Sequence, residues 1–294
     1  MTDVGYRGRS RAESAVVHAV WDELGGELVE EFVVPTVPGD PSRARNIDGV
    51  FVAGERKWHR AYTPLALRDR DVTICQAKAG VLDFGVLGQT LFGAELIDRH
   101  HRPASLRLVA AAVNTNPVIE ELITVYRPNR RVIEHRTYPH LPVGKSSGAE
   151  AKPALRQVLV ETLHRDVGGL LIFRAKRGPR DFGNVRVGDT SLRFLEMNAV
   201  ILPARRRREI AADAVVEIDP DEPVGLVYTC SDLYMTAMGR AVFAGEYARS
   251  HLGLVNARSF LRYGVDNSAL RELLAPFEHV VLPAAAAVTL RSRL

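Results

Sequence analysis

The order of helix-like and strand-like apolar segments in the first 135 residues is the feature that most constrains the fold of this chain. Apolar residues at helical spacing, Val16, Val20 and Leu24, predict a helix over residues 10–24 that ends at two consecutive glycines. Three strands are predicted to follow, over residues 28–34, 46–53 and 72–79. After them the sequence predicts a helix over residues 85–101, a strand over 106–113, a helix that starts at residue 116 and a short strand near residues 132–133. Three consecutive strands favour an antiparallel meander, and a helix between the third and fourth strands favours their parallel pairing. The sequence therefore predicts an α/β domain with a mixed β-sheet flanked by helices.

The second half of the chain repeats features of the first half. A shift of 151 residues aligns residues 87–123 with residues 238–274 and gives eight identities. Chance at one fixed offset gives about two or three. Between the halves lies a stretch rich in proline, glycine and serine, which is typical of a linker. We therefore predict a tandem duplication, with one domain over residues 1–138, a linker over 139–153 and a second domain over 154–294.

Composition excludes several classes of protein. The chain is 46% hydrophobic and 25% charged, which is typical of a globular protein. No apolar run approaches the roughly 18 residues of a membrane span, and the polar first eleven residues have no signal-peptide pattern, so we expect a cytoplasmic protein. Cys75 and Cys230 are too few for a disulfide framework or a zinc site. The formal net charge of +4 permits nucleic acid as a partner without requiring it.

Three polar residues in the predicted strands form the candidate site. Residues two apart in a strand share a face, so Gln76 and Lys78 point the same way at the end of an otherwise apolar strand. Such breaks in an apolar pattern concentrate at functional sites. Asp48 lies in the preceding strand and is followed by Gly49, which permits a close approach to the backbone. If these strands pair, a carboxylate, an amide and an ammonium converge at one end of the sheet, and a divalent cation held by such oxygen ligands can assist phosphodiester hydrolysis.

The spacing Asp48…Gln76-x-Lys78, after a helix with an early Glu13, resembles the restriction-endonuclease-like superfamily, whose motif is written PD-(D/E)xK. The glutamine form of the second element is similar to the branch that includes Mrr-like restriction enzymes. The family core of helix, three strands, helix and strand is similar to residues 10–113. The resemblance implies that Asp48 is the principal metal ligand, Gln76 a weaker oxygen ligand and Lys78 the catalytic lysine. It also implies that Glu13 ligates the metal, directly or through water, and that the cofactor is Mg²⁺ or Mn²⁺.

The chain departs from the family pattern at two positions. Ile47 stands where the family motif has proline. The neutral Gln76 replaces an acid, which should weaken metal binding or favour a single metal ion. Glu13 also has a purely structural explanation, because Ser10 and Glu13 form a capping-box pattern at the start of the first predicted helix.

The predicted function is the hydrolysis of phosphodiester bonds by a metal-dependent nuclease, with DNA favoured over RNA, in restriction, defence or repair. One alternative is a catalytically inactive protein of the same fold that binds nucleic acid or senses a ligand. A second is an unrelated α/β enzyme, although the sequence has no glycine-rich phosphate loop, nucleophile elbow or zinc-ligand spacing. The shift of 151 places Val227 and Thr229 at the positions of Gln76 and Lys78, so the second domain is predicted to be an inactive copy. Related nucleases often act as dimers, which leaves a homodimer open and lets the second copy act as a built-in partner.

Overall fold

A computed structural model divides the chain into two compact units, Met1–Glu150 and Ala151–Leu294. The residues that the structure describes are 11–37, 40–59, 63–115, 117–142, 169–172, 181–187, 190–196, 200–203, 215–217, 223–250, 254–265, 268–277 and 281–282. Residues 143–153 of the expected linker lie outside these ranges.

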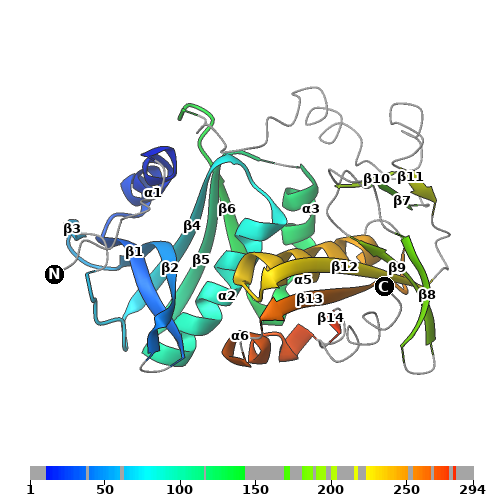
Figure 1. Ribbon diagram of the computed structural model, residues 1–294. Helices are drawn as coiled ribbons and strands as arrows, with labels where there is room; N and C mark the ends of the chain where they lie inside the picture. Colours follow the sequence, from blue (N-terminus) through cyan, green and yellow to red (C-terminus); the bar gives the residue numbers. More distant parts are fainter. Residues whose placement is uncertain are drawn as a thin grey trace. The chain divides into compact units, whose positions relative to one another are not determined.

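The first unit has the predicted order of helices and strands (Figure 1). Its elements are α1 (Arg11–Leu24), β1 (Glu27–Val37), β2 (Asp40–Val52), β3 (Lys57–His59), β4 (Asp71–Val81), α2 (Phe84–His101), β5 (Ser105–Asn114), α3 (Pro117–Val125), the 3-10 turn η1 (Pro128–Arg130) and β6 (Ile133–Thr137). Every helix and strand expected in this half is confirmed. The short strand β3 was not expected, because its residues lie in a polar insertion.

The strands of the first unit form one mixed sheet in the order β3-β1-β2-β4-β5-β6. Strands β1 and β2 pair antiparallel, as do β2 and β4, which confirms the predicted meander. Strands β4 and β5 pair parallel across the crossover helix α2, and β5 and β6 also pair parallel. The fold class predicted from the sequence, an α/β domain with a mixed sheet flanked by helices, is therefore confirmed for this unit.

Helices α1 and α2 cover opposite faces of this sheet (Figure 1). On one face, Cys75 and Ala77 of β4 belong to a buried cluster with Val16, Val17 and Val20 of α1. The alternate residues of β4 point to the other face, where α2 lies. There a Cβ atom on Gly93 of α2 would lie 3.8 Å from Cδ1 of Ile74. The even-numbered residues of β4, which include both polar candidates, therefore belong to the α2 face.

The two glycines that the sequence predicts at the end of the first helix do end it. Helix α1 stops at Leu24, after which Gly25 and Gly26 adopt the left-handed conformation, with φ of +68° and +76°.

Strand β1 runs two residues beyond Pro35, whereas the sequence had predicted that it ends before this proline. Strand β3 pairs only with residues 27–29 of β1, so the later part of β1 is an edge, where the missing N–H of a proline is tolerated.

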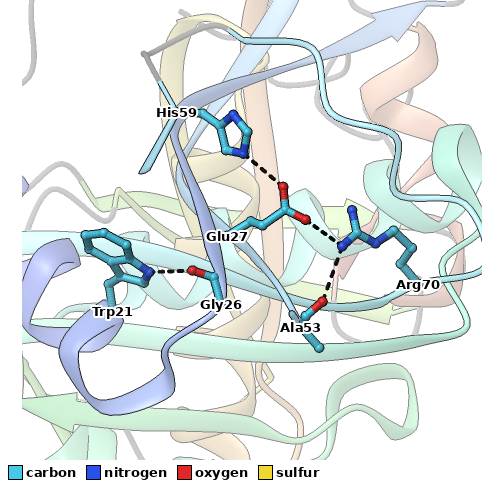
Figure 2. Close-up of polar contacts among 6 residues, drawn as sticks. All are labelled: Trp21, Gly26, Glu27, Ala53, His59 and Arg70. Atoms are coloured by element: carbon cyan, nitrogen blue, oxygen red, sulfur yellow. Dashed lines mark hydrogen bonds and ion pairs between the residues drawn. The ribbon is translucent and has the colours of Figure 1, made fainter. Parts of the chain in front are cut away.

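Polar contacts attach the short strand β3 and the loop before β4 to the start of β1 (Figure 2). The Glu27 carboxylate lies 2.9 Å from Nε2 of His59 and accepts a hydrogen bond of 2.6 Å from the guanidinium of Arg70. The same guanidinium donates to the carbonyl of Ala53. The indole of Trp21, in the last turn of α1, donates to the carbonyl of Gly26 at 2.9 Å. These bonds fix the end of the sheet that lies away from the candidate site.

The second unit is also built of strands and helices. Its described elements are β7 (Gly169–Ile172), β8 (Asp181–Val187), β9 (Thr190–Glu196), β10 (Val200–Pro203), β11 (Val215–Glu217), β12 (Val224–Asp232), α5 (Met235–Ser250), β13 (Arg258–Val265), α6 (Ser268–Glu272), η4 (Ala275–Phe277) and β14 (Val281–Leu282). Five strands form a sheet in the order β8-β9-β12-β13-β14, and three more form a small sheet in the order β10-β7-β11. Of the helices that the structure describes in either unit, none is long and apolar enough to cross a membrane.

Replacing Gly49 by alanine should destabilise the first unit. A Cβ atom on Gly49 would lie 2.8 Å from Cγ1 of Val17, so α1 or the side chain must move. We expect the free energy of unfolding to fall by about 1–3 kcal/mol, the usual cost of overpacking a core. Urea unfolding measures this loss. Gly80→Ala is the matched control, because its Cβ meets no atom within 4 Å, and it should change stability by less than about 0.5 kcal/mol. Equal effects of the two changes would contradict the close approach of α1 at Gly49.

The contacts of Glu27 predict a pH dependence of stability. The hydrogen bond from Arg70, and then that from His59, lower the pKa of Glu27 below its ordinary value of 4.5. Because the pKa is lower in the folded protein, this stabilisation is complete above about pH 4.5 and is lost as the pH falls through the folded pKa.

Arg70→Met should therefore cost about 1 kcal/mol at pH 7 and much less at pH 3, measured by denaturant unfolding at both pH values. Arg68→Met is the control, because the pair of Arg68 with Asp69 is 3.8 Å long and highly exposed. A cost for Arg70→Met that is the same at pH 3 as at pH 7 would rule out the stabilising role of Glu27.

Candidate active site

The site begins where strands β2 and β4 part. Their paired residues run from Val52 opposite Val72 to Gly49 opposite Cys75 and go no further. The next residue of β2 is Asp48, and its carboxylate oxygen Oδ2 accepts the backbone N–H of Ala77 at 2.7 Å. A side chain thus takes the place of a backbone partner at the point of separation, and this satisfies an N–H that would otherwise lack an acceptor.

The backbone conformation explains why Asp48 turns toward β4. In β1, Leu28 packs in the α1 cluster whereas Phe32 contacts the ring of His101 in α2, with the ring centroids 5.4 Å apart. Residues four apart in a regular strand share a face, so the pleat of β1 must reverse between these two. Glu31, with φ of +51°, lies at the reversal.

The same reversal occurs in β2. Phe51 packs in the α1 cluster, whereas Ile47 lies close to Gly93 of α2. Register places Gly49 opposite Glu30 and Ile47 opposite Phe32. Asp48 therefore lies at the reversal, where a side chain can point along the sheet toward the neighbouring strand rather than away from either face.

Gln76 is the buried polar residue of the site, with only 2% of its surface exposed. It lies beside Ala110 of β5 on the α2 face. Its side-chain nitrogen lies 3.5 Å from the carbonyl oxygen of Asn46, in β2. The Asn46 amide in turn donates to the buried carboxylate of Glu31 at 3.1 Å. A buried amide is costly without partners, so this chain of contacts across three strands supports Gln76 in its position.

Lys78 lies next to a β-bulge and pairs with the aspartate that caps the start of α2. The register of β4 and β5 shifts between Lys78 and Val81. The Lys78 ammonium forms an ion pair with Oδ2 of Asp83, and 37% of each side chain is exposed. The other oxygen of Asp83 accepts the N–H of Val86 at 3.0 Å, which makes Asp83 the N-cap of α2. The start of α2 and the end of β4 therefore meet at the lysine.

The structure places three of the four predicted site residues at the same end of the sheet. The N–H that Asp48 accepts belongs to Ala77, between Gln76 and Lys78, so the carboxylate lies against the backbone that joins these two residues. Glu13 lies in the first turn of α1, and α1 covers the opposite face from Gln76 and Lys78. Ser10, its expected partner in the capping box, lies outside the described residues.

Sequence reasoning missed two acidic residues near the site. An aspartate directly before a helical run is an N-cap signal, so Asp83 could have been found from the sequence. Its ion pair with Lys78 could not, because that contact depends on the bulge between the two residues. Glu31 gave no signal in the sequence, because an acid in an alternating strand is normally expected on a solvent-exposed face.

The side chains at this end of the sheet that could hold a hard divalent cation through oxygen are those of Asp48 and Gln76. The Asp48 carboxylate and the Gln76 amide come from neighbouring strands at one end of the sheet. Among the residues that the structure describes, no three histidine, cysteine, aspartate or glutamate side chains gather into a metal-ligand group. Mg²⁺ is commonly held by one or two carboxylates, with water and substrate phosphates as further ligands. The set suits that mode of binding better than an all-protein cage.

Comparison of the chain with protein-family models, with curated proteins and with solved structures finds no match.

Proposed function

We propose that the protein is a metal-dependent nuclease that hydrolyses phosphodiester bonds in DNA, with its active site at Asp48, Gln76 and Lys78. The observation that carries the proposal is the hydrogen bond from Ala77 to Asp48, since it holds a carboxylate against the strand that presents an amide and an ammonium. The topology of the first unit, with an antiparallel meander followed by a parallel crossover, also supports a restriction-endonuclease-like core.

Each residue has a separate role in this proposal. Asp48 and the amide oxygen of Gln76 would hold Mg²⁺ or Mn²⁺, which polarises the phosphoryl group and lowers the pKa of a bound water when it is present. Lys78 supplies a positive charge beside the scissile phosphate and orients the attacking water. Glu13 belongs to this set only if its side chain reaches around the end of the sheet from α1, so the proposal rests on the other three residues.

The second unit is proposed to be a duplicated copy of the fold without the site. At the shift of 151 residues, β12, α5 and β13 begin and end within three residues of the positions given by β4, α2 and β5. Phe92 and Phe243, which this shift aligns, are both fully buried. One pairing differs, because β9 and β12 are parallel whereas β2 and β4 are antiparallel. Val227 and Thr229 stand at the positions of Gln76 and Lys78, so a nuclease site is not expected in this copy.

A second candidate function is the binding of nucleic acid without cleavage. It is favoured by the lack of a three-acid ligand group among the described residues and by the neutral Gln76. A protein that only binds has no need of both Asp48 and Lys78, so their substitution distinguishes the two functions.

Lys78→Ala and Asp48→Ala should each reduce metal-dependent DNA cleavage by at least about 100-fold. Lys78→Ala removes a positive charge that stabilises the transition state, and Asp48→Ala removes the carboxylate that would hold the metal ion. Cleavage of labelled single-stranded and duplex DNA with Mg²⁺ measures the effect, and circular dichroism checks the fold. Lys57→Ala and Asp69→Asn are matched controls at exposed positions of the same unit and should cleave at the wild-type rate. Wild-type cleavage by either site variant would show that the active site is assigned wrongly.

The charge at position 76 should set the affinity for metal. Gln76→Glu adds a carboxylate to the donors, so we expect cleavage to persist with half-maximal activity at a Mg²⁺ concentration lower by about tenfold. Gln76→Ala removes the oxygen and should raise that concentration. A titration of cleavage rate against Mg²⁺ compares the three proteins. Gln76 would be excluded as a ligand if the alanine variant reached half-maximal activity at a lower Mg²⁺ concentration than the wild type. The same conclusion would follow if neither substitution changed that concentration.

A further inference from the structure

We propose that Asp83 is a positioning residue for Lys78, which it holds in place before substrate arrives. This inference rests on the proposed nuclease function and adds to the site the N-cap residue that precedes α2. The sequence motif contains no counterpart of this residue, and its role follows only from the contacts that the folded chain makes.

Asp83 is itself held rigidly, and this makes it a suitable anchor. Its oxygen Oδ1 accepts the N–H of Val86 at 3.0 Å, while its backbone is extended, with φ of −137° and ψ of 168°. The backbone carbonyl of Asp83 accepts from the N–H groups of Val86 and Leu87 at 3.1 and 3.3 Å. An anchor whose own rotamer is locked by hydrogen bonds can fix a flexible partner.

Lys78 is the partner that needs such an anchor. A lysine has four flexible carbon–carbon bonds in its side chain, and an unrestrained ammonium samples many positions. Lys78 also lies at a bulge and beside the small residue Ala112 of β5. The ion pair with Oδ2 of Asp83 therefore restrains the ammonium at the partly exposed end of the side chain.

The geometry leaves the ammonium able to act. An ammonium has three N–H donors, and the contact with Asp83 needs one of them. The side chain of Lys78 is 37% exposed, so a phosphate oxygen or a water can reach the remaining donors. Orientation before the substrate binds lowers the barrier to the chemical step without changing the contacts that hold the substrate. Asp83 should therefore affect kcat far more than KM.

The two roles of Asp83, capping the helix and holding the lysine, can be separated by substitution. Asparagine and serine are as good as aspartate at an N-cap, but asparagine has no charge and serine does not reach the ammonium. Alanine loses both roles. A set of three variants, Asp83→Asn, Asp83→Ser and Asp83→Ala, therefore tests the positioning role apart from the structural one.

For the full-length protein cleaving DNA with saturating Mg²⁺, we expect Asp83→Asn and Asp83→Ser to lower kcat by about 10- to 100-fold, the range usual for residues that orient an active group. KM should stay within about threefold and Tm within about 2 °C of the wild type, whereas Asp83→Ala should lower both kcat and Tm. A kcat within twofold of the wild type in the asparagine and serine variants would reduce Asp83 to a helix cap and overturn the inference.

A second measurement tests the contact without relying on activity. In a double-variant cycle of Asp83→Asn and Lys78→Met, the shift in Tm of the double variant should be smaller than the sum of the single shifts, because both changes break the same pair. Additive shifts would overturn the inference. Failure of the proposed function looks different, because then the wild type does not cleave DNA and Lys78→Ala changes nothing.

Discussion

The arrangement of the candidate site depends on the hydrogen bond from the Ala77 N–H to the Asp48 carboxylate. Strands β2 and β4 stop pairing one residue earlier, at Gly49 and Cys75, so the buried edge of β4 needs an acceptor at this point. A side chain can supply it because β1 and β2 reverse their pleat at Glu31 and Asp48. The same feature that ends the pairing therefore places a carboxylate at the end of the sheet, against the backbone between Gln76 and Lys78.

Both faces of the sheet contribute to this arrangement. On the α1 face, the missing side chain of Gly49 lets Val17 approach β2 closely, which fixes the strand beside Asp48. On the α2 face, Asp83 begins the helix and pairs with Lys78, so the helix that links β4 to β5 also restrains the lysine. Packing on the α1 face thus fixes the strand that carries Asp48, and the helix cap on the α2 face restrains Lys78.

Much of this could be predicted from the sequence, and the reasons are local. Alternation in β4 placed Gln76 and Lys78 on one face, and the order of apolar segments gave the meander and the parallel crossover correctly. What could not be predicted depends on contacts between elements or on irregular backbone. The pleat reversal at Glu31, the bulge after Lys78 and the strand formed by Lys57–His59 have no periodic signal. The sequence alone also could not place Glu13 on the opposite face, because that position depends on how α1 packs against the sheet.

We propose that the first unit cleaves DNA with the help of a divalent metal ion. The most direct test incubates the purified full-length protein with single-stranded and duplex DNA in Mg²⁺, in Mn²⁺ and in excess chelator, with RNA as a comparison substrate. We expect cleavage of DNA with either metal ion and none with chelator. DNA that is bound but left intact under every metal condition, or cut equally well in chelator, would contradict it.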